Sequence, residues 1–309
     1  MSRRGPLFGF RCVHLFDGSE HHHRRRKELL VNLEAQNLFS LKGKTALLTG
    51  ASGYLGRTLA EVLLQNGATL HALGRSEELE KRAQGWNDKY GEGSATVHRI
   101  DMYDRELLGT TLDKIIERGP VHVLVNNAHE LGANTGFNVP NGGLEGMTWD
   151  HWLRNLTGGI YWAALATQKV GEGMKAAGGG SIINIATMYA LVAPSPLLYE
   201  DTAFMNPPGY STSKAGLMAF TRYVASFWGP HNIRANSILP GPFPNTETAS
   251  ENAVRTGNDD FLQKLNNRTC LRRTGKAHEL AGALLYLASD ASSFVTGHGL
   301  VVDGGWTAI

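Results

Sequence analysis

Tyr210 and Lys214 are the residues of this sequence whose types and spacing most directly suggest chemistry. They stand four positions apart in the segment Tyr210-Ser211-Thr212-Ser213-Lys214, which opens a stretch with helical character. Residues at i and i+4 share a helical face, so the ammonium group can lie near the phenol. A phenol with a pKa near ~10 is a poor base at neutral pH, and a neighbouring cation favours its ionised form. The pair can therefore move a proton while a bound cofactor carries hydride.

This spacing alone is a weak signal, because Tyr-x-x-x-Lys occurs by chance in many proteins. Ser211-x-x-Lys214 also matches the nucleophile motif of β-lactamases. The partner motifs of those enzymes are missing, and a nucleotide-binding pattern lies upstream. We therefore interpret the second match as a coincidence.

The upstream pattern is a glycine-rich turn, Gly50-Ala51-Ser52-Gly53-Tyr54-Leu55-Gly56, between an apolar run and a helical one. Glycines permit a tight turn there and let a pyrophosphate approach the backbone N–H groups at the helix N-terminus. The competing phosphate loop fails, because Gly43-Lys44-Thr45 would need its first glycine where Leu38 stands.

The choice of cofactor is indicated by the end of the second predicted strand, Leu73-Gly74-Arg75-Ser76. An acidic residue roughly 20 positions beyond the turn would hold the ribose 2′-OH of NAD. Gly74 stands at that place, and the guanidinium of Arg75 could pair with a 2′-phosphate. We therefore expect NADP(H), with NAD(H) as the alternative if Arg75 is only an exposed loop residue.

Strands and helices alternate from Lys42 onward. Apolar runs predict seven strands, at 44–48, 68–73, 95–100, 121–126, 181–186, 233–239 and 299–302. Helical spacing predicts helices at 55–65, 76–89, 105–117, 148–177, 211–228 and 278–287. Such alternation implies parallel pairing with right-handed crossovers. The expected fold is α/β: a single doubly wound (Rossmann) domain with a mostly parallel seven-stranded sheet flanked by helices.

Composition narrows the class of protein. The chain has 309 residues, of which 42% are hydrophobic, and this fraction is too high for disorder of the whole chain. Two cysteines, Cys12 and Cys270, cannot build a disulfide framework, so we expect a reducing, cytoplasmic setting. No apolar run reaches the ~18 residues of a membrane span. Neither a membrane nor a nucleic acid is an expected partner, because the basic residues do not form a concentrated face on the body.

Residues 1–40 differ from the rest. They hold seven Arg or Lys residues, and the run His21-His22-His23-Arg24-Arg25-Arg26-Lys27 has no apolar periodicity. Such a run is compatible with a metal site, a nucleic-acid arm or a targeting peptide. Adjacent histidines alone fix no metal geometry, however, and transit peptides are poor in acids such as Asp17. We predict a basic, disordered extension over 1–40 and a catalytic domain over 41–309.

The body, about residues 40–309, resembles the short-chain dehydrogenase/reductase family. Seven features match in the family's order and near its spacing: Thr49-Gly50 through Gly56, Asp101, Asn126-Asn127-Ala128, Asn155, Tyr210 with Lys214, Pro240-Gly241, and Val301-Val302-Asp303-Gly304-Gly305. The stretches 38–50 and 272–305 are most similar to the branch with gluconate 5-dehydrogenase-like and other sugar or polyol oxidoreductases.

The resemblance implies roles for the matching residues. Tyr210 would be the general acid/base, Lys214 would lower its pKa and bind the nicotinamide ribose, and Asn155 would hold a water in the proton relay. Thr187 stands where the family has its catalytic serine. No metal is expected, and residues 242–270 would form a lid over the substrate. The implied cofactor-binding residues are Gly50, Ser52, Gly53, Tyr54, Leu55, Gly56, Arg75, Asp101, Met102, Asn127, Ala128, Tyr210, Lys214, Pro240 and Gly241.

Three residues depart from the family's pattern. The hydroxyl of Thr187 can still bond a carbonyl, but its methyl group narrows the site, or the residue merely packs at a strand end. Tyr54 stands where this branch has glycine, which gives the spacing of the extended, epimerase-like branch. His129 replaces the last glycine of Asn-Asn-Ala-Gly, and it could titrate near pH 7 or be a spectator.

The loop between Thr187 and Tyr210 has 22 residues, more than is usual in the family. Its prolines make it stiff and irregular. Because it lies beside the reacting centre, Tyr199, Glu200 and Asp201 could bond a hydroxylated substrate. A surface excursion or a subunit contact is the alternative.

We therefore predict a short-chain NAD(P)(H)-dependent dehydrogenase/reductase that interconverts a secondary alcohol and a ketone on a sugar, a polyol or a similar polar molecule. The glycine spacing leaves open a sugar-nucleotide epimerase or dehydratase with bound NAD. Thr187, Tyr54 and His129 leave open a cofactor-binding pseudoenzyme. By resemblance the chain would form a homo-oligomer, a tetramer or dimer, through the helices predicted at 148–177 and 211–228.

Overall fold

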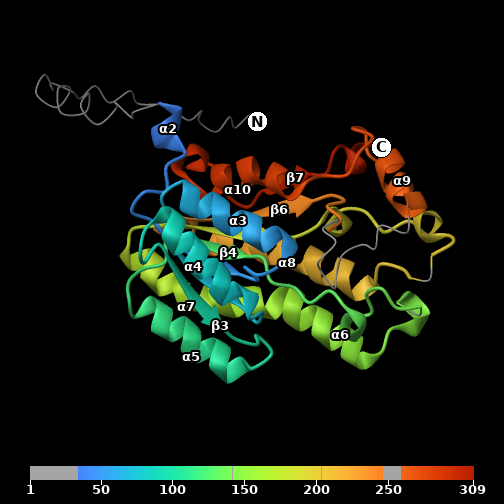
Figure 1. Cartoon of the computed structure of the whole chain (residues 1–309), viewed down its shortest axis with the longest axis horizontal. Coiled ribbons are helices and arrows are strands. Elements are labelled where there is room, and N and C mark those ends of the chain that lie inside the picture. The colour runs from blue at the N-terminus through green and yellow to red at the C-terminus, as the bar shows by residue number, and fades with distance from the viewer. Residues whose placement is uncertain (1–33, 141, 203, 246–258) are drawn as a thin grey trace, which may run out of the picture. The chain divides into compact units, whose positions relative to one another are not determined.

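The computed structural model describes residues 34–140, 142–202, 204–245 and 259–309 (Figure 1). Its contacts group the chain into two units, Met1–Leu38 and Phe39–Ile309. In the first unit the described part is the short helix α2 (Ala35–Leu38) with the residue before it. The predicted disorder of the extension falls mostly outside the described residues.

The second unit is built on a seven-stranded sheet in which every pair of neighbouring strands is parallel. The strand order is β3-β2-β1-β4-β5-β6-β7. The strands are β1 (Thr45–Thr49), β2 (Thr69–Gly74), β3 (Ala95–Arg99), β4 (Val123–Asn126), β5 (Gly180–Ile185), β6 (Ile233–Pro240) and β7 (Gly299–Val302). This confirms the predicted doubly wound α/β fold. The strand order reverses between β1 and β4, and ligands of such sheets bind at the carboxyl ends of the strands around that point.

Helices cover both faces of the sheet (Figure 1). On one face α3, α4 and α10 pack against alternate strand residues such as Leu48, and on the other α5, α7 and α8 pack against residues such as Leu47. Successive strand residues point to opposite faces, which is why both are apolar. The helices are α3 (Tyr54–Gln65), α4 (Glu78–Tyr90), α5 (Arg105–Ile116), α6 (Trp149–Leu156), α7 (Trp162–Ala176), α8 (Pro208–Trp228), α9 (Asp259–Arg268) and α10 (Ala281–Ala288).

The long helix predicted at 148–177 is interrupted. Between α6 and α7 the chain forms one π-helical segment, Thr157–Tyr161. A Cβ on Gly159 would lie 2.3 Å from Ser213 Oγ, so this glycine lets the segment approach α8 closely. Insertion of one extra residue in a helical turn is the usual origin of such a segment. Periodicity alone did not predict the break.

Two further elements differ from the prediction. Helix α8 begins at Pro208 rather than 211, because proline is well suited to the first helical position. The region predicted as a lid, 242–270, contains helix α9, while its residues 246–258 lie outside the described ones. Within the described residues no helix is both long enough and apolar enough to cross a membrane.

Candidate active site

Tyr210 and Lys214 lie in the first turns of α8, at the carboxyl edge of the sheet. Lys214 is buried, and its Nζ donates a hydrogen bond of 2.7 Å to the carbonyl oxygen of Ile185, the last residue of β5. This bond fixes the ammonium group beside the end of the strand that leads to Thr187. Burial lowers the pKa of Lys214 to about 7, because the low-dielectric interior disfavours its charged form.

The ring of Tyr210 is held by two edge-to-face aromatic contacts. His129 and Phe137 each lie 5.0 Å from it, centroid to centroid. Burial raises the pKa of Tyr210 to about 12, and the neighbouring hydroxyl of Thr187 acts in the opposite direction. The family resemblance implies that Lys214 lowers the pKa of Tyr210, and this effect stays a prediction.

Asn155 is completely buried in the last turn of α6. Its Nδ2 donates to the carbonyl oxygens of Thr135 and His151, both at 2.8 Å. These two bonds fix the orientation of the amide. They leave Oδ1 as a buried acceptor that has no hydrogen-bond partner among the described residues.

The glycine turn is built against the loop that follows β4. Gly50 has a φ of +68°, and a Cβ there would lie 2.8 Å from the Cα of Ala128. Asn127 Nδ2 donates to the carbonyl oxygens of Thr49 and Gly50, both at 3.1 Å. Asn127 and Ala128 therefore have a structural role in shaping the turn. This role is compatible with their predicted contact with the cofactor.

The N-terminus of α3 forms an open cradle. Gly53 occupies the N-cap position, no side chain caps the first amides, and the first turn contains no acidic residue. A Cβ on Gly56 would lie 2.0 Å from the carbonyl oxygen of Gly50, so only glycine allows the helix to start this close to the strand. Unpaired amides at a helix start favour an anion. The residues present thus fit the diphosphate of a dinucleotide.

The other predicted cofactor residues lie along the same edge. Arg75 is exposed directly after β2 and has no carboxylate partner among the described residues, while a Cβ on Gly74 would lie 2.9 Å from Ser52 Oγ. Asp101 is exposed and Met102 is buried, both just beyond β3. Tyr54 and Leu55 are half-buried at the start of α3, and Pro240 and Gly241 follow at the end of β6, where Gly241 N donates to Val302 O at 2.9 Å.

A comparison with known proteins agrees with this arrangement. The family model described as Enoyl-(Acyl carrier protein) reductase matches residues 50–307. The chain belongs to the short-chain dehydrogenase/reductase family. This confirms the family predicted from the seven motifs.

Relatives of the predicted branch are among the most similar proteins. The sorbose reductase of Schizosaccharomyces pombe is 32% identical over 277 residues, which cover 87% of this chain and 98% of that protein. The gluconate 5-dehydrogenase of Gluconobacter oxydans is 32% identical and covers 88% and 97%. The crystal structure of a gluconate 5-dehydrogenase from Burkholderia cenocepacia, in complex with NADP and tartrate, is 29% identical with a TM-score of 0.77, covering 89% of this chain and 100% of that one.

The loop between Thr187 and Tyr210 packs against helix α9. Tyr199 is half-buried, and its ring lies 5.6 Å from that of Phe261 in α9. Lys264 Nζ donates to the carbonyl oxygen of Glu200 at 2.5 Å and lies 3.6 Å from a carboxylate oxygen of Asp201. Tyr199, Glu200 and Asp201, which were candidates for bonding a substrate, thus each have a contact with α9. No pattern in the sequence predicted α9, so this contact was not predicted either.

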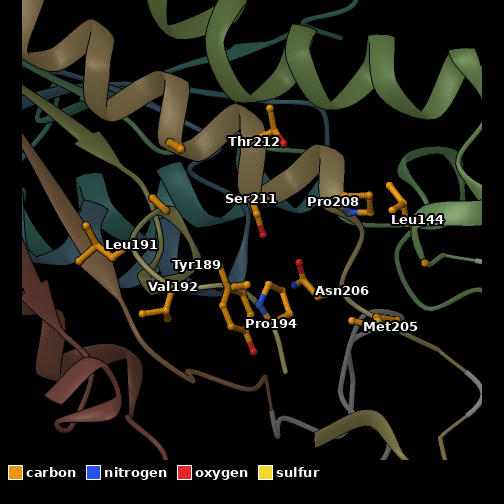
Figure 2. A pocket seen from close by; sticks show the side chains of 14 residues that line it. Leu144, Tyr189, Leu191, Val192, Pro194, Met205, Asn206, Pro208, Ser211 and Thr212 are labelled. Carbon is orange, nitrogen blue, oxygen red and sulfur yellow. The ribbon is translucent and has the colours of Figure 1, made fainter. Parts of the chain in front are cut away.

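A cavity of about 460 Å³ lies beside the start of α8 (Figure 2). Its walls are mostly apolar and come from the same loop, from the first turns of α8 and from Gly143 and Leu144. Ser211 and Asn206 point side-chain oxygens into it, and those oxygens have no hydrogen-bond partner among the described residues. Thr187 and Tyr210 are not among the residues that line it. The described residues hold no cluster of His, Cys, Asp or Glu that could bind a metal ion.

Proposed function

We propose that this protein is an NADP(H)-dependent oxidoreductase that interconverts a secondary alcohol and a ketone on a sugar, a polyol or a similar polar molecule. The observation that carries the proposal is the half-buried phenol of Tyr210, which lies beside the hydroxyl of Thr187 and one helical turn from Lys214. A phenol that keeps its proton at neutral pH is suited to act as a general acid toward a developing alkoxide.

Each residue of the site has a defined task in this proposal. NADP(H), when bound, supplies or accepts the hydride. Tyr210 gives its phenolic proton to the carbonyl oxygen during reduction and takes it back during oxidation. The hydroxyl of Thr187 orients the phenol and the substrate oxygen. Lys214 is fixed by its hydrogen bond to the Ile185 carbonyl oxygen. Because its pKa is about 7, it can give a proton to, or take one from, water near the phenol of Tyr210 at neutral pH.

The preference for the phosphorylated cofactor rests on Arg75. Its guanidinium is exposed at the end of β2, where the acidic residue of NAD-binding proteins is replaced by Gly74. A free guanidinium is a strong partner for a 2′-phosphate. The solved gluconate 5-dehydrogenase described above was crystallised with NADP, which supports the same choice.

The test follows NADPH and NADH separately with a panel of keto sugars and polyols. We expect turnover with at least one polar ketone, a higher kcat/KM with NADPH, and loss of turnover in Tyr210→Phe. Binding of cofactor without turnover over the whole panel would favour a pseudoenzyme. Tightly retained NAD with no net consumption of added cofactor would favour an epimerase or dehydratase.

We also propose a cytoplasmic homo-oligomer, a tetramer or dimer, assembled through α6 and α8. Large apolar side chains are exposed on these two helices and on the π-helical segment that follows α6: Trp149, Leu153, Leu156, Tyr161, Tyr223 and Phe227. The last two stack with a centroid distance of 5.8 Å. Apolar area of this kind is favourable to bury against a second copy. Light scattering of the wild type and of Phe227→Glu tests it, and a monomeric wild type would refute it.

A further inference from the structure

His129 lies in the centre of the site although its position is usually a glycine in the family. It follows β4 at the carboxyl edge of the sheet, and its ring meets the ring of Tyr210 edge-on at 5.0 Å. A Cβ on Gly159 would lie 3.3 Å from His129 Cε1, so the π-helical segment leaves just enough room for the imidazole. The interrupted helix and the histidine are therefore complementary in shape.

Polar atoms of this ring and of the neighbouring Asn155 lack hydrogen-bond partners, and they could serve as partners for one another. Both ring nitrogens of His129 are inaccessible to solvent and lack a hydrogen-bond partner among the described residues, and so does Asn155 Oδ1. Buried polar atoms almost always have partners, which are frequently internal waters. The side chain of Asn155 and the backbone of Gly158 lie next to the ring, and both act to raise the pKa of His129, as acceptors of a ring N–H do.

Donor and acceptor counting assigns the hydrogen bonds. Asn155 spends both N–H groups on Thr135 and His151, so its Oδ1 can only accept. A neutral imidazole has one N–H donor and one acceptor nitrogen. Burial and the Lys214 cation keep the pKa of His129 well below its usual value of 6.5, so the ring is neutral at physiological pH. Its donor matches Asn155 Oδ1, and its acceptor needs a donor from the side of Lys214.

We propose that His129 is a positioning residue of the proton path, which donates to Asn155 Oδ1 and accepts from a water shared with the Lys214 ammonium. This rests on the proposed function. In ketone reduction the phenol of Tyr210 transfers one proton to the substrate oxygen and must regain one proton before the next turnover. The water held by His129 and Lys214 hands on that proton, and His129 itself stays neutral.

The kinetic test compares His129→Phe with His129→Gln. Phenylalanine keeps the ring and its contact with Tyr210 but has no nitrogen, whereas glutamine retains a donor and an acceptor. We expect His129→Phe to lower kcat about tenfold, with little change in KM, and to increase the solvent isotope effect. His129→Gln should recover most of the rate. His278→Gln, an exposed histidine on another element, is the matched control.

The pH profile separates this role from a structural one. The titratable groups that face the path are Tyr210 and Lys214 of α8, with Tyr189 beyond the phenol. His129→Phe should shift the profile of kcat, while its melting temperature and NADPH affinity match those of the wild type. A wild-type kcat and pH profile in His129→Phe would overturn the proposal. Equal loss of rate in both variants, together with a lower melting temperature, would also overturn it.

A second measurement does not depend on activity. In ¹⁵N-histidine-labelled protein, His129→Phe identifies the His129 signals by their loss. We expect one protonated and one hydrogen-bonded, unprotonated ring nitrogen at pH values well below 6.5, and a shift of the N–H signal in Asn155→Leu. A ring that becomes protonated near pH 6.5, or a signal that Asn155→Leu leaves in place, would refute the assignment. If the wild type turned over no substrate, the proposed function would fail, and this spectrum would still decide the hydrogen bonds.

Discussion

Tyr210→Phe is the substitution with the most sharply defined outcome. The two edge-to-face contacts at 5.0 Å involve the ring rather than the hydroxyl, so phenylalanine keeps them. The hydroxyl and its interaction with the neighbouring Thr187 are lost. A single hydrogen bond contributes about 0.5–1.5 kcal/mol to stability, and removal of a buried hydroxyl offsets part of this. We therefore expect the free energy of unfolding to change by no more than about 1 kcal/mol.

The effect on turnover should be much larger. A positioned general acid/base contributes roughly 10²–10⁴ in rate, which at about 1.36 kcal/mol for each factor of ten equals about 2.7–5.4 kcal/mol of activation free energy. The assay combines initial rates of NADPH oxidation, NADPH affinity from fluorescence, and thermal melts. Tyr90→Phe, which removes a hydroxyl bonded to Glu61 outside the site, is the matched control and should keep its rate. A Tyr210→Phe rate within threefold of the wild type would refute the assignment of the phenol.

Three other substitutions test the remaining parts of the site. Lys214→Met should remove a pH dependence of stability. The pKa of Lys214 in the folded protein, about 7, lies below its unfolded value, so the folded wild type binds fewer protons and its free energy of unfolding should rise between about pH 7 and 10. Urea titrations of the variant should show no such rise. Gly56→Ala places a Cβ 2.0 Å from the Gly50 carbonyl oxygen, so it should lower the free energy of unfolding by about 1–3 kcal/mol and abolish cofactor binding. Gly85→Ala, in open space within α4, is the control and should raise the free energy of unfolding by about 0.5–1 kcal/mol, as measured by thermal melts of both variants. Arg75→Ala should weaken NADPH binding about 10–100-fold and leave NADH binding unchanged in fluorescence titrations, since one charge-assisted contact is lost; equal weakening of both would contradict its role.

The sequence by itself determined the order of the elements and the local chemistry. Alternating apolar runs and helical spacing are short-range patterns, and they predicted the seven parallel strands. The glycine turn is equally local, because the φ of Gly50 and the contact of Gly56 are set within seven residues. The four-residue spacing of Tyr210 and Lys214 also needs only a helix.

Tertiary structure alone decided how those groups behave. The pKa of Lys214 is lowered to about 7 because strands and helices from the whole domain exclude water from it, and no local motif encodes that exclusion. The docking of α9 on Tyr199 and the enclosure of His129 join segments far apart in the chain. Burial and hydrogen-bond satisfaction are properties of packed surfaces, so they become visible only when distant segments meet.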